Sequence, residues 1–199
     1  MFYFDMDGVL VKYDIGAYVG NEPTFRKIGR HYFRDLSPED NMLAAFNKLC
    51  VQAPDDVYVL TSVSETQPIR NEQIFDKLYW LTQHAPKFDI GAHFIAATSS
   101  KRTTIADIKG MPITKNDVLI DDYNTNLFKW VSAGGTAIKC LNGINSPDSW
   151  PGICIDITRD SETILGQLKK IWYMLHVYGK LDNEYISHMF EREVRKDEV

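Results

Sequence analysis

The chain has 199 residues, of which 44% are hydrophobic and 25% are charged, an ordinary composition for one globular domain. Its formal net charge of -5 is unlike that of a protein that neutralises a nucleic-acid backbone, which argues against extended nucleic acid as a partner. The three cysteines, Cys50, Cys140 and Cys154, share no metal-ligand spacing, and we expect free thiols in a reducing compartment.

The beginning of the chain is apolar, but Asp5 and Asp7 interrupt the apolar residues before they could form a signal peptide. No stretch of the sequence is long and apolar enough to span a bilayer. We therefore expect a cytoplasmic protein that has no membrane partner.

Short apolar runs alternate with amphipathic stretches along the chain. The runs predict buried strands at 2–4, 57–60, 92–97, 117–120, 135–140 and 152–157. Helices are predicted over 38–51 and over 68–83, the second with Ile74, Phe75, Leu78 and Leu81 on its apolar face. This alternation predicts an α/β fold, a doubly wound, Rossmann-like parallel sheet with helices on both faces. Ligands of such sheets bind beyond the carboxyl ends of the strands.

Two further segments, one after the first strand and one after the last, complete the chain. Residues 11–36 carry several glycines and aromatic residues, and they predict a small insertion over the site. Within it, the aromatic residues either stack on a nucleobase of the substrate or only pack the insertion onto the core; they are Tyr13, Tyr18, Phe25, Tyr32 and Phe33. Residues 161–199 predict a C-terminal helical extension, whose apolar stripe either covers the core or forms a homodimer contact.

Asp5 and Asp7 follow the first strand in the motif Asp-Met-Asp-Gly-Val-Leu. The two-residue period of a strand points both carboxylates to the same side. Because two like charges repel, the pair predicts either hard-metal binding or a dyad whose carboxyls ionise at different pH. Gly8 permits the sharp turn that follows. The alternative is that the aspartates only terminate the strand.

Polar side chains also follow the next three strands. Thr61 and Ser62 either hold a phosphoryl oxygen or cap the next helix, and Lys101 either offsets the charge of a phosphate or lies exposed in a loop. Asp121 and Asp122 add a second carboxylate pair, one of which could be a helix N-cap. A site with four carboxylates binds a phosphate dianion only with a divalent cation, and oxygen ligands of this kind select Mg²⁺.

The order of these motifs resembles the haloacid dehalogenase (HAD) superfamily phosphatases. The segment Asp5-Met6-Asp7-Gly8-Val9-Leu10 is similar to the first motif of the family, Thr61 to the second, Lys101 to the third and the pair Asp121 and Asp122 to the fourth. Within the superfamily, these motifs look closest to the 5'(3')-deoxyribonucleotidases. The resemblance covers roughly residues 1–175 and implies a single HAD-like domain over 1–199, with a cap reduced to residues 11–36.

The resemblance implies a role for each motif residue. Asp5 would attack phosphorus to form an aspartyl-phosphate, while Asp7 would protonate the leaving oxygen and then activate water. Mg²⁺ would be held by the Asp5 carboxylate, the Asp7 backbone carbonyl, Asp121 and Asp122. The phosphate group would be bound by Gly8, Thr61, Ser62 and Lys101.

The implied function is Mg²⁺-dependent hydrolysis of a phosphomonoester, with a (deoxy)ribonucleoside 5'-monophosphate as substrate. Another small phosphorylated metabolite, such as a sugar phosphate, is the alternative substrate. A different class, a receiver-like signalling or binding domain without turnover, combines similar residue types. The order of motifs argues against it, because a receiver ends with its lysine, whereas here the acidic pair at Asp121 and Asp122 follows Lys101.

Overall fold

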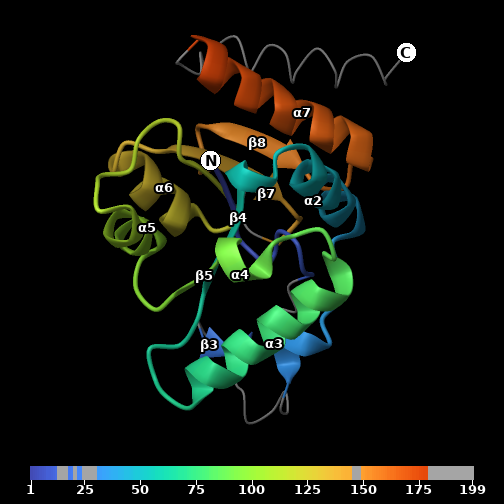
Figure 1. The fold of residues 1–199 in the computed structure, drawn as a ribbon, viewed down its shortest axis with the longest axis vertical. Helices are drawn as coiled ribbons and strands as arrows, with labels where there is room; N and C mark the ends of the chain where they lie inside the picture. Colours follow the sequence, from blue (N-terminus) through green and yellow to red (C-terminus); the bar gives the residue numbers. More distant parts are fainter. Residues whose placement is uncertain (13–17, 20–21, 24–30, 145–148, 179–199) are drawn as a thin grey trace.

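The computed structural model describes residues 1–12, 18–19, 22–23, 31–144 and 149–178 (Figure 1). Six parallel strands form its main sheet, in the order β5-β4-β1-β6-β7-β8. Taken in chain order these are strands 3-2-1-4-5-6, the arrangement of a doubly wound Rossmann sheet. The predicted fold class is therefore confirmed. The strands are β1 (Phe2–Phe4), β4 (Val57–Ser62), β5 (Phe94–Ala97), β6 (Val118–Asp121), β7 (Thr136–Leu141) and β8 (Ile153–Asp156).

Helices cover both faces of this sheet (Figure 1). One core packs β1 against α2 (Asp40–Gln52) and α7 (Ser161–Tyr173), and the other packs it against α5 (Lys101–Lys109) and α6 (Asn124–Ser132). Strand β1 divides its side chains between the two cores, because alternate residues of a strand face opposite sides. Phe2 and Phe4 belong to the first core and Tyr3 to the second.

The remaining elements lie around the sheet. They are the two-stranded pair β2 (Tyr18–Val19) and β3 (Glu22–Pro23), the helix α3 (Ile69–His84), the short helix α4 (Ile90–His93), the 3-10 turns η2 (Tyr32–Arg34) and η3 (Pro54–Asp56), and the π-helical turn η4 (Met174–Tyr178). The predicted strand at 92–97 begins later than expected. Ala92 and His93 belong to α4, because the Asp89 side chain caps that helix by accepting a hydrogen bond from the Ala92 N–H at 3.1 Å.

The C-terminal extension begins as predicted with an amphipathic helix. The buried residues of α7 pack into the same core as α2, so this part of the apolar stripe covers the core. Residues 179–199 lie outside the described residues, and the homodimer contact stays a prediction. None of the described helices is long and apolar enough to cross a bilayer.

The sheet places the site at its topological switch point. Strand β1 lies between β4 and β6, with Phe4 opposite both Val59 and Ile120. The Asp5 N–H continues this register by donating to the Ile120 carbonyl at 2.8 Å. Asp5 therefore lies level with the end of β6, at the edge where doubly wound sheets bind their ligands.

Candidate active site

Four of the predicted site residues meet beyond the carboxyl ends of β1, β4 and β6. Asp5 follows β1, Thr61 lies near the end of β4, Asp121 ends β6, and Lys101 is the first residue of α5. All four are buried. The Lys101 ammonium lies 2.8 Å from Asp5 Oδ1 and 2.6 Å from Asp121 Oδ2. The alternative of an exposed loop lysine is therefore wrong, because two buried carboxylates hold this side chain inside the protein.

The environment of Asp5 makes its charge costly. Burial, together with the nearby Asp121 and Asp7 carboxylates, raises the pKa of Asp5 to about 7, although Lys101 opposes the shift. Oδ1 accepts a hydrogen bond from the Met6 N–H at 2.8 Å and forms an ion pair with Lys101. Among the described residues no hydrogen bond is found to Oδ2, which leaves this oxygen for a substrate or a cation.

Three carboxylates of the site could hold a metal ion together. Asp5, Asp121 and Asp122 each present one oxygen, and these oxygens lie within 4.8 Å of one another. Buried carboxylate oxygens are hard ligands, and Lys101 alone cannot neutralise three of them. The residues therefore fit Mg²⁺. The Asp7 side chain is not among the three, and the expected contribution of its backbone carbonyl stays a prediction.

Amide side chains fix the acidic pair in position. Asp121 Oδ1 accepts from the Tyr123 N–H at 2.8 Å and its Oδ2 from Asn126 at 3.0 Å, so this residue also shapes the chain entering α6. The helix N-cap itself is Tyr123. Asn142 donates to Asp122 Oδ2 at 2.8 Å and to the Gly8 carbonyl at 2.9 Å. Asn142 thus links the acidic pair to the turn after β1.

Gly8 forms the predicted sharp turn, and two features of its position require glycine. Its φ of +76° lies in the left-handed region. A Cβ atom there would lie 2.3 Å from Asp122 Oδ2 and 2.9 Å from Asn142 Nδ2. The turn can therefore approach the acidic pair only without a side chain. A role for Gly8 in binding phosphate stays a prediction.

Sequence reasoning missed a residue that touches two of the site residues. Lys77, on α3, is fully buried and donates to Asp7 Oδ2 at 2.5 Å and to Thr61 Oγ1 at 2.6 Å. The predicted apolar face of this helix is only partly right. Leu81 is buried and Ile74 and Leu78 are half-buried, but Phe75 is 56% exposed. The buried residues are Gln73, Asp76, Lys77, Trp80 and Leu81. Their spacing of i, i+3, i+4, i+7 and i+8 was readable from the sequence, but three of the five are polar.

The two hydroxyl residues at the end of β4, Thr61 and Ser62, were expected either to bind phosphate or to cap the next helix. The N-cap of α3 is Pro68, which provides no side-chain cap, and the Thr61 hydroxyl is bound by Lys77 instead. For Thr61 the helix-cap alternative is therefore wrong. Ser62 is exposed at the end of β4, and its role in binding phosphate stays a prediction.

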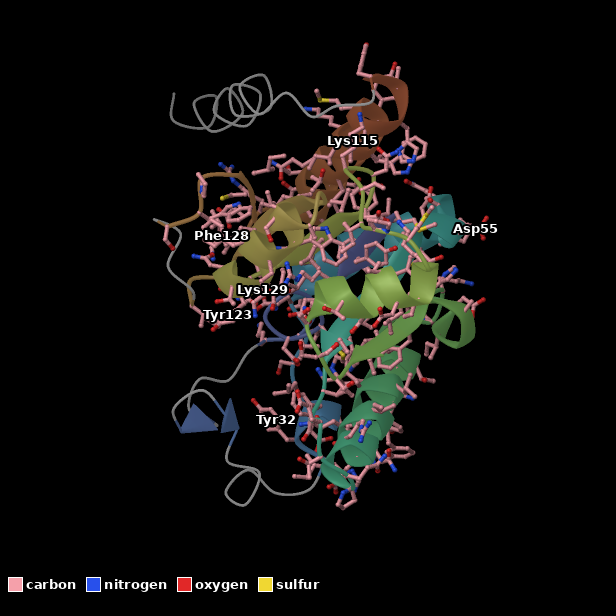
Figure 2. All side chains as sticks on the ribbon, turned by 90° about the vertical axis from the view of Figure 1, so that its left-hand side faces the viewer. Tyr32, Asp55, Lys115, Tyr123, Phe128 and Lys129 are labelled. Carbon is pink, nitrogen blue, oxygen red and sulfur yellow. The ribbon has the colours of Figure 1, made fainter. Side chains whose placement is uncertain are left out.

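The expected substrate-stacking residues fall largely outside the described part of the chain. Tyr13 and Phe25 lie outside it, and Tyr18 lies in β2 but its side chain is not described. Of the five predicted residues, the structure describes the side chains of Tyr32 and Phe33, and Phe33 is buried against Lys77. Tyr123 precedes α6 and is 51% exposed, while Tyr32 lies on η2 next to α3 (Figure 2).

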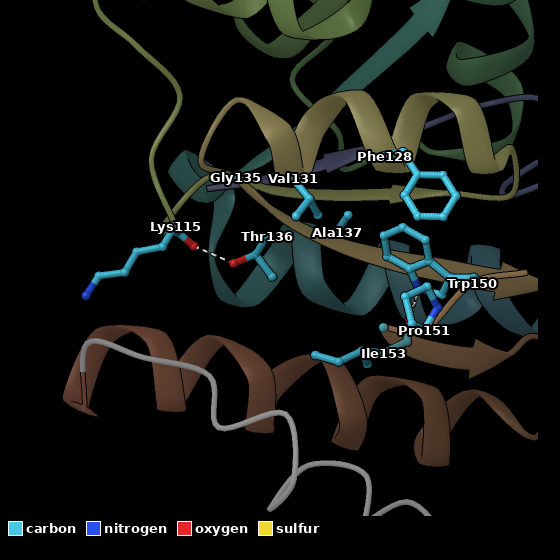
Figure 3. Close-up of a pocket in the computed structure, with 10 residues that line it drawn as sticks. Lys115, Phe128, Val131, Gly135, Thr136, Ala137, Trp150, Pro151 and Ile153 are labelled. Atoms are coloured by element: carbon cyan, nitrogen blue, oxygen red, sulfur yellow. Dashed lines mark hydrogen bonds between the residues drawn. The ribbon is translucent and has the colours of Figure 1, made fainter.

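A groove of about 490 Å³ lies at the opposite end of the sheet (Figure 3). It borders the amino ends of β7 and β8, where the Thr136 hydroxyl donates to the Lys115 carbonyl at 2.7 Å. Phe128 packs edge-on against Trp150 at its wall. None of the clustered carboxylates lines this groove, so it is separate from the site.

Comparison with known proteins supports the fold. No protein-family model matches the chain, and no curated protein matches it in sequence. The structure is similar to the crystal structure of a HAD-superfamily hydrolase from Ehrlichia chaffeensis, with a TM-score of 0.51 and 10% sequence identity over 85% of this chain and 96% of the other. The two proteins therefore share an α/β fold, and in this chain a buried aspartate cluster lies at the carboxyl edge of the sheet.

Proposed function

We propose that the protein is a Mg²⁺-dependent phosphomonoesterase that forms an aspartyl-phosphate on Asp5. One observation carries the proposal: Asp5, Asp7, Thr61, Lys101 and the acidic pair come from separate parts of the chain and converge at the switch point of the sheet. Structural ion pairs would not require so many polar groups at the one edge where doubly wound sheets bind ligands.

In this mechanism Oδ2 of Asp5 attacks phosphorus, and the bond from phosphorus to the ester oxygen breaks. Asp7 gives a proton to that oxygen, and the alcohol leaves. Water then attacks the aspartyl-phosphate while Asp7 takes one of its protons, and inorganic phosphate leaves with the Asp5 carboxylate restored. Lys101 holds Asp5 Oδ1, so that the attacking oxygen faces the substrate.

Asp5, Asp121 and Asp122 would hold the cation. When bound, Mg²⁺ supplies positive charge beside the phosphoryl oxygens, which allows a dianion to approach a cluster of carboxylates. Thr61 and Lys101 supply a hydroxyl and an ammonium at the same edge.

For the substrate we propose a nucleoside 5'-monophosphate, with deoxyribonucleotides favoured. The support is the resemblance of the four motifs to those of the 5'(3')-deoxyribonucleotidases. A sugar phosphate is the second candidate. We also propose a cytoplasmic location, in keeping with the three free cysteines Cys50, Cys140 and Cys154.

The receiver-like alternative predicts a different strand order. Receivers share the order 2-1-3-4-5, in which the first strand pairs with the second and third. Here β1 pairs with β4 and β6, the second and fourth strands of the sheet in chain order. The topology therefore favours the hydrolase over the signalling domain.

The test is phosphate release by the purified protein, with and without Mg²⁺, from deoxyribonucleotides, ribonucleotides, sugar phosphates and an aryl phosphate. We expect turnover that requires Mg²⁺ and is abolished by Asp5→Asn. The matched control is Asp156→Asn, which makes the same change at the end of β8, outside the carboxylate cluster. Release that persists in Asp5→Asn would contradict the proposal, and a preference for sugar phosphates would contradict only the substrate assignment.

A further inference from the structure

Lys77 is a buried cation that none of the four motifs includes. It projects from the middle of α3, and its side chain has no exposed surface. A buried ammonium is costly unless it is paired, and the hydrogen-bond partners of Lys77 are Asp7 and Thr61, which both belong to the proposed machinery. This pairing suggests a function in the reaction, beyond packing.

The hydrogen bonds of Lys77 determine which atoms of its partners remain available. An ammonium only donates, so Thr61 Oγ1 must accept, and the Thr61 hydroxyl proton must point away from Lys77. At Asp7, the ammonium binds Oδ2, while Oδ1 is buried and has no hydrogen-bond partner among the described residues. A buried carboxylate oxygen without a partner is costly, which is consistent with an oxygen that serves a substrate.

The last part of the predicted insertion, residues 31–36, holds Lys77 from its other side. The ammonium lies 4.5 Å from the centroid of the Phe33 ring, a cation–π contact. This segment is tied along α3 by His31, which lies 2.8 Å from Asp76, and by Trp80, whose indole N–H donates to the Leu36 carbonyl at 2.7 Å. Phe33 is thereby kept over the ammonium.

We infer that Lys77 is a positioning residue that assigns the acid/base work of Asp7 to its Oδ1 atom and directs the Thr61 hydroxyl proton toward the phosphoryl group. The inference rests on the proposed function. In the first step the proton passes from Oδ1 to the ester oxygen as the bond to phosphorus breaks, and in the second Oδ1 takes a proton from the attacking water. Lys77 itself neither gains nor loses a proton.

The test compares two substrates that differ in their need for an acid. An alkyl phosphate has a poor leaving group that must be protonated, whereas an aryl phosphate with an acidic phenol leaves without that help. The values of kcat/KM report the first step alone, because release of the alcohol or phenol precedes attack by water. A loss of Asp7 positioning therefore lowers kcat/KM for the alkyl phosphate more than for the aryl phosphate.

We expect Lys77→Met to lower the alkyl-to-aryl ratio of kcat/KM by roughly tenfold or more, since general acid catalysis contributes about 10²–10⁴-fold. Lys77→Arg, which keeps the charge, should recover part of the ratio. In the Asp7→Asn background, Lys77→Met should change the ratio no further, because the acid that it positions is already absent. The inference would be overturned if Lys77→Met lowered kcat/KM equally for both substrates in the native background. It would also be overturned if Lys77→Met lowered the alkyl-to-aryl ratio as much in the Asp7→Asn background as in the native one.

Two outcomes distinguish a failure of the proposed function from a failure of the role of Lys77. A wild-type protein that hydrolyses neither phosphate in Mg²⁺ would overturn the proposed function, and the role of Lys77 with it. A wild-type protein that hydrolyses both, combined with an unchanged ratio in Lys77→Met, would overturn the role of Lys77 alone. If Lys77→Met does not fold, Phe33→Leu decides, because it keeps the ammonium but removes the ring. We then expect a smaller fall in the same ratio, and no change would overturn the inference.

Discussion

Removing the Lys101 ammonium is expected to destabilise the protein markedly. Its side chain is 2% exposed and lies between the carboxylates of Asp5 and Asp121, at 2.8 Å and 2.6 Å. Breaking a buried ion pair by removing one partner costs about 3–5 kcal/mol. Because the pKa of Asp5 is already raised to about 7, this residue can take up a proton and relieve part of the cost. We therefore expect Lys101→Met to lose about 3 kcal/mol, at the lower end of that range.

Urea denaturation at pH 7 without Mg²⁺ measures this loss. For a chain of this size the same change lowers the melting temperature by roughly 6–12 °C. The matched control is Lys48→Met, which breaks an ion pair between exposed side chains of Lys48 and Glu162. The control should change the unfolding free energy by less than about 1 kcal/mol. A similar small change for Lys101→Met would refute the buried ion pair as a source of stability.

Three further predictions follow from the site. Gly8→Ala should lower the unfolding free energy by about 1–2 kcal/mol, because the φ of Gly8 is left-handed. It should also weaken Mg²⁺ binding, because the new Cβ would meet Asp122. An unchanged urea midpoint and an unchanged Mg²⁺ affinity by calorimetry would contradict this prediction. Asn142→Leu should weaken Mg²⁺ binding about 10–100-fold in the same calorimetric titration, since it frees Asp122 from its amide donor, and wild-type affinity would count against that contact. Because the pKa of Asp5 is raised, this carboxyl keeps its proton in the folded state between about pH 4 and 7, whereas in the unfolded state it has lost it. Without Mg²⁺, the contribution of Asp5 to the free energy of unfolding therefore falls as the pH rises through that window. Melting curves should therefore show a larger stabilisation by Mg²⁺ at pH 8 than at pH 5, and an equal gain at both would contradict the shift.

The strand-end residues of the site could be located from the sequence because the parallel sheet leaves little freedom there. Once β1, β4 and β6 are predicted as parallel neighbours, Asp5, Thr61 and Asp121 must lie at one edge. Their motif order then suggests the chemistry. The burial of Lys101 was not determined by its own local sequence, because its two carboxylate partners come from other strands.

The contributions of helices and loops were harder to predict. The face of α3 that turns inward includes Asp76 and Lys77, which hydropathy alone assigns to the surface. Lys77 can be buried only because Asp7 and Thr61, far away in the sequence, accept its hydrogen bonds. Asn142 is similar, since its partners are an acidic pair and a turn from other segments. For α3, tertiary pairing of polar groups overrode the hydrophobic period, and for Asn142, which follows β7, the local sequence carries no signal of its partners.

The most direct test of the central claim is to locate the covalent phosphate. Asp7→Asn removes the base that activates water, yet an aryl phosphate can still react in the first step because its phenol leaves without an acid. Tandem mass spectrometry of Asp7→Asn, quenched in acid after reaction with the aryl phosphate and Mg²⁺, is expected to find phosphate on Asp5. Phosphate found on another residue would contradict Asp5 as the nucleophile. So would the absence of phosphorylated Asp5 in the variant, if the wild-type protein turns over the aryl phosphate.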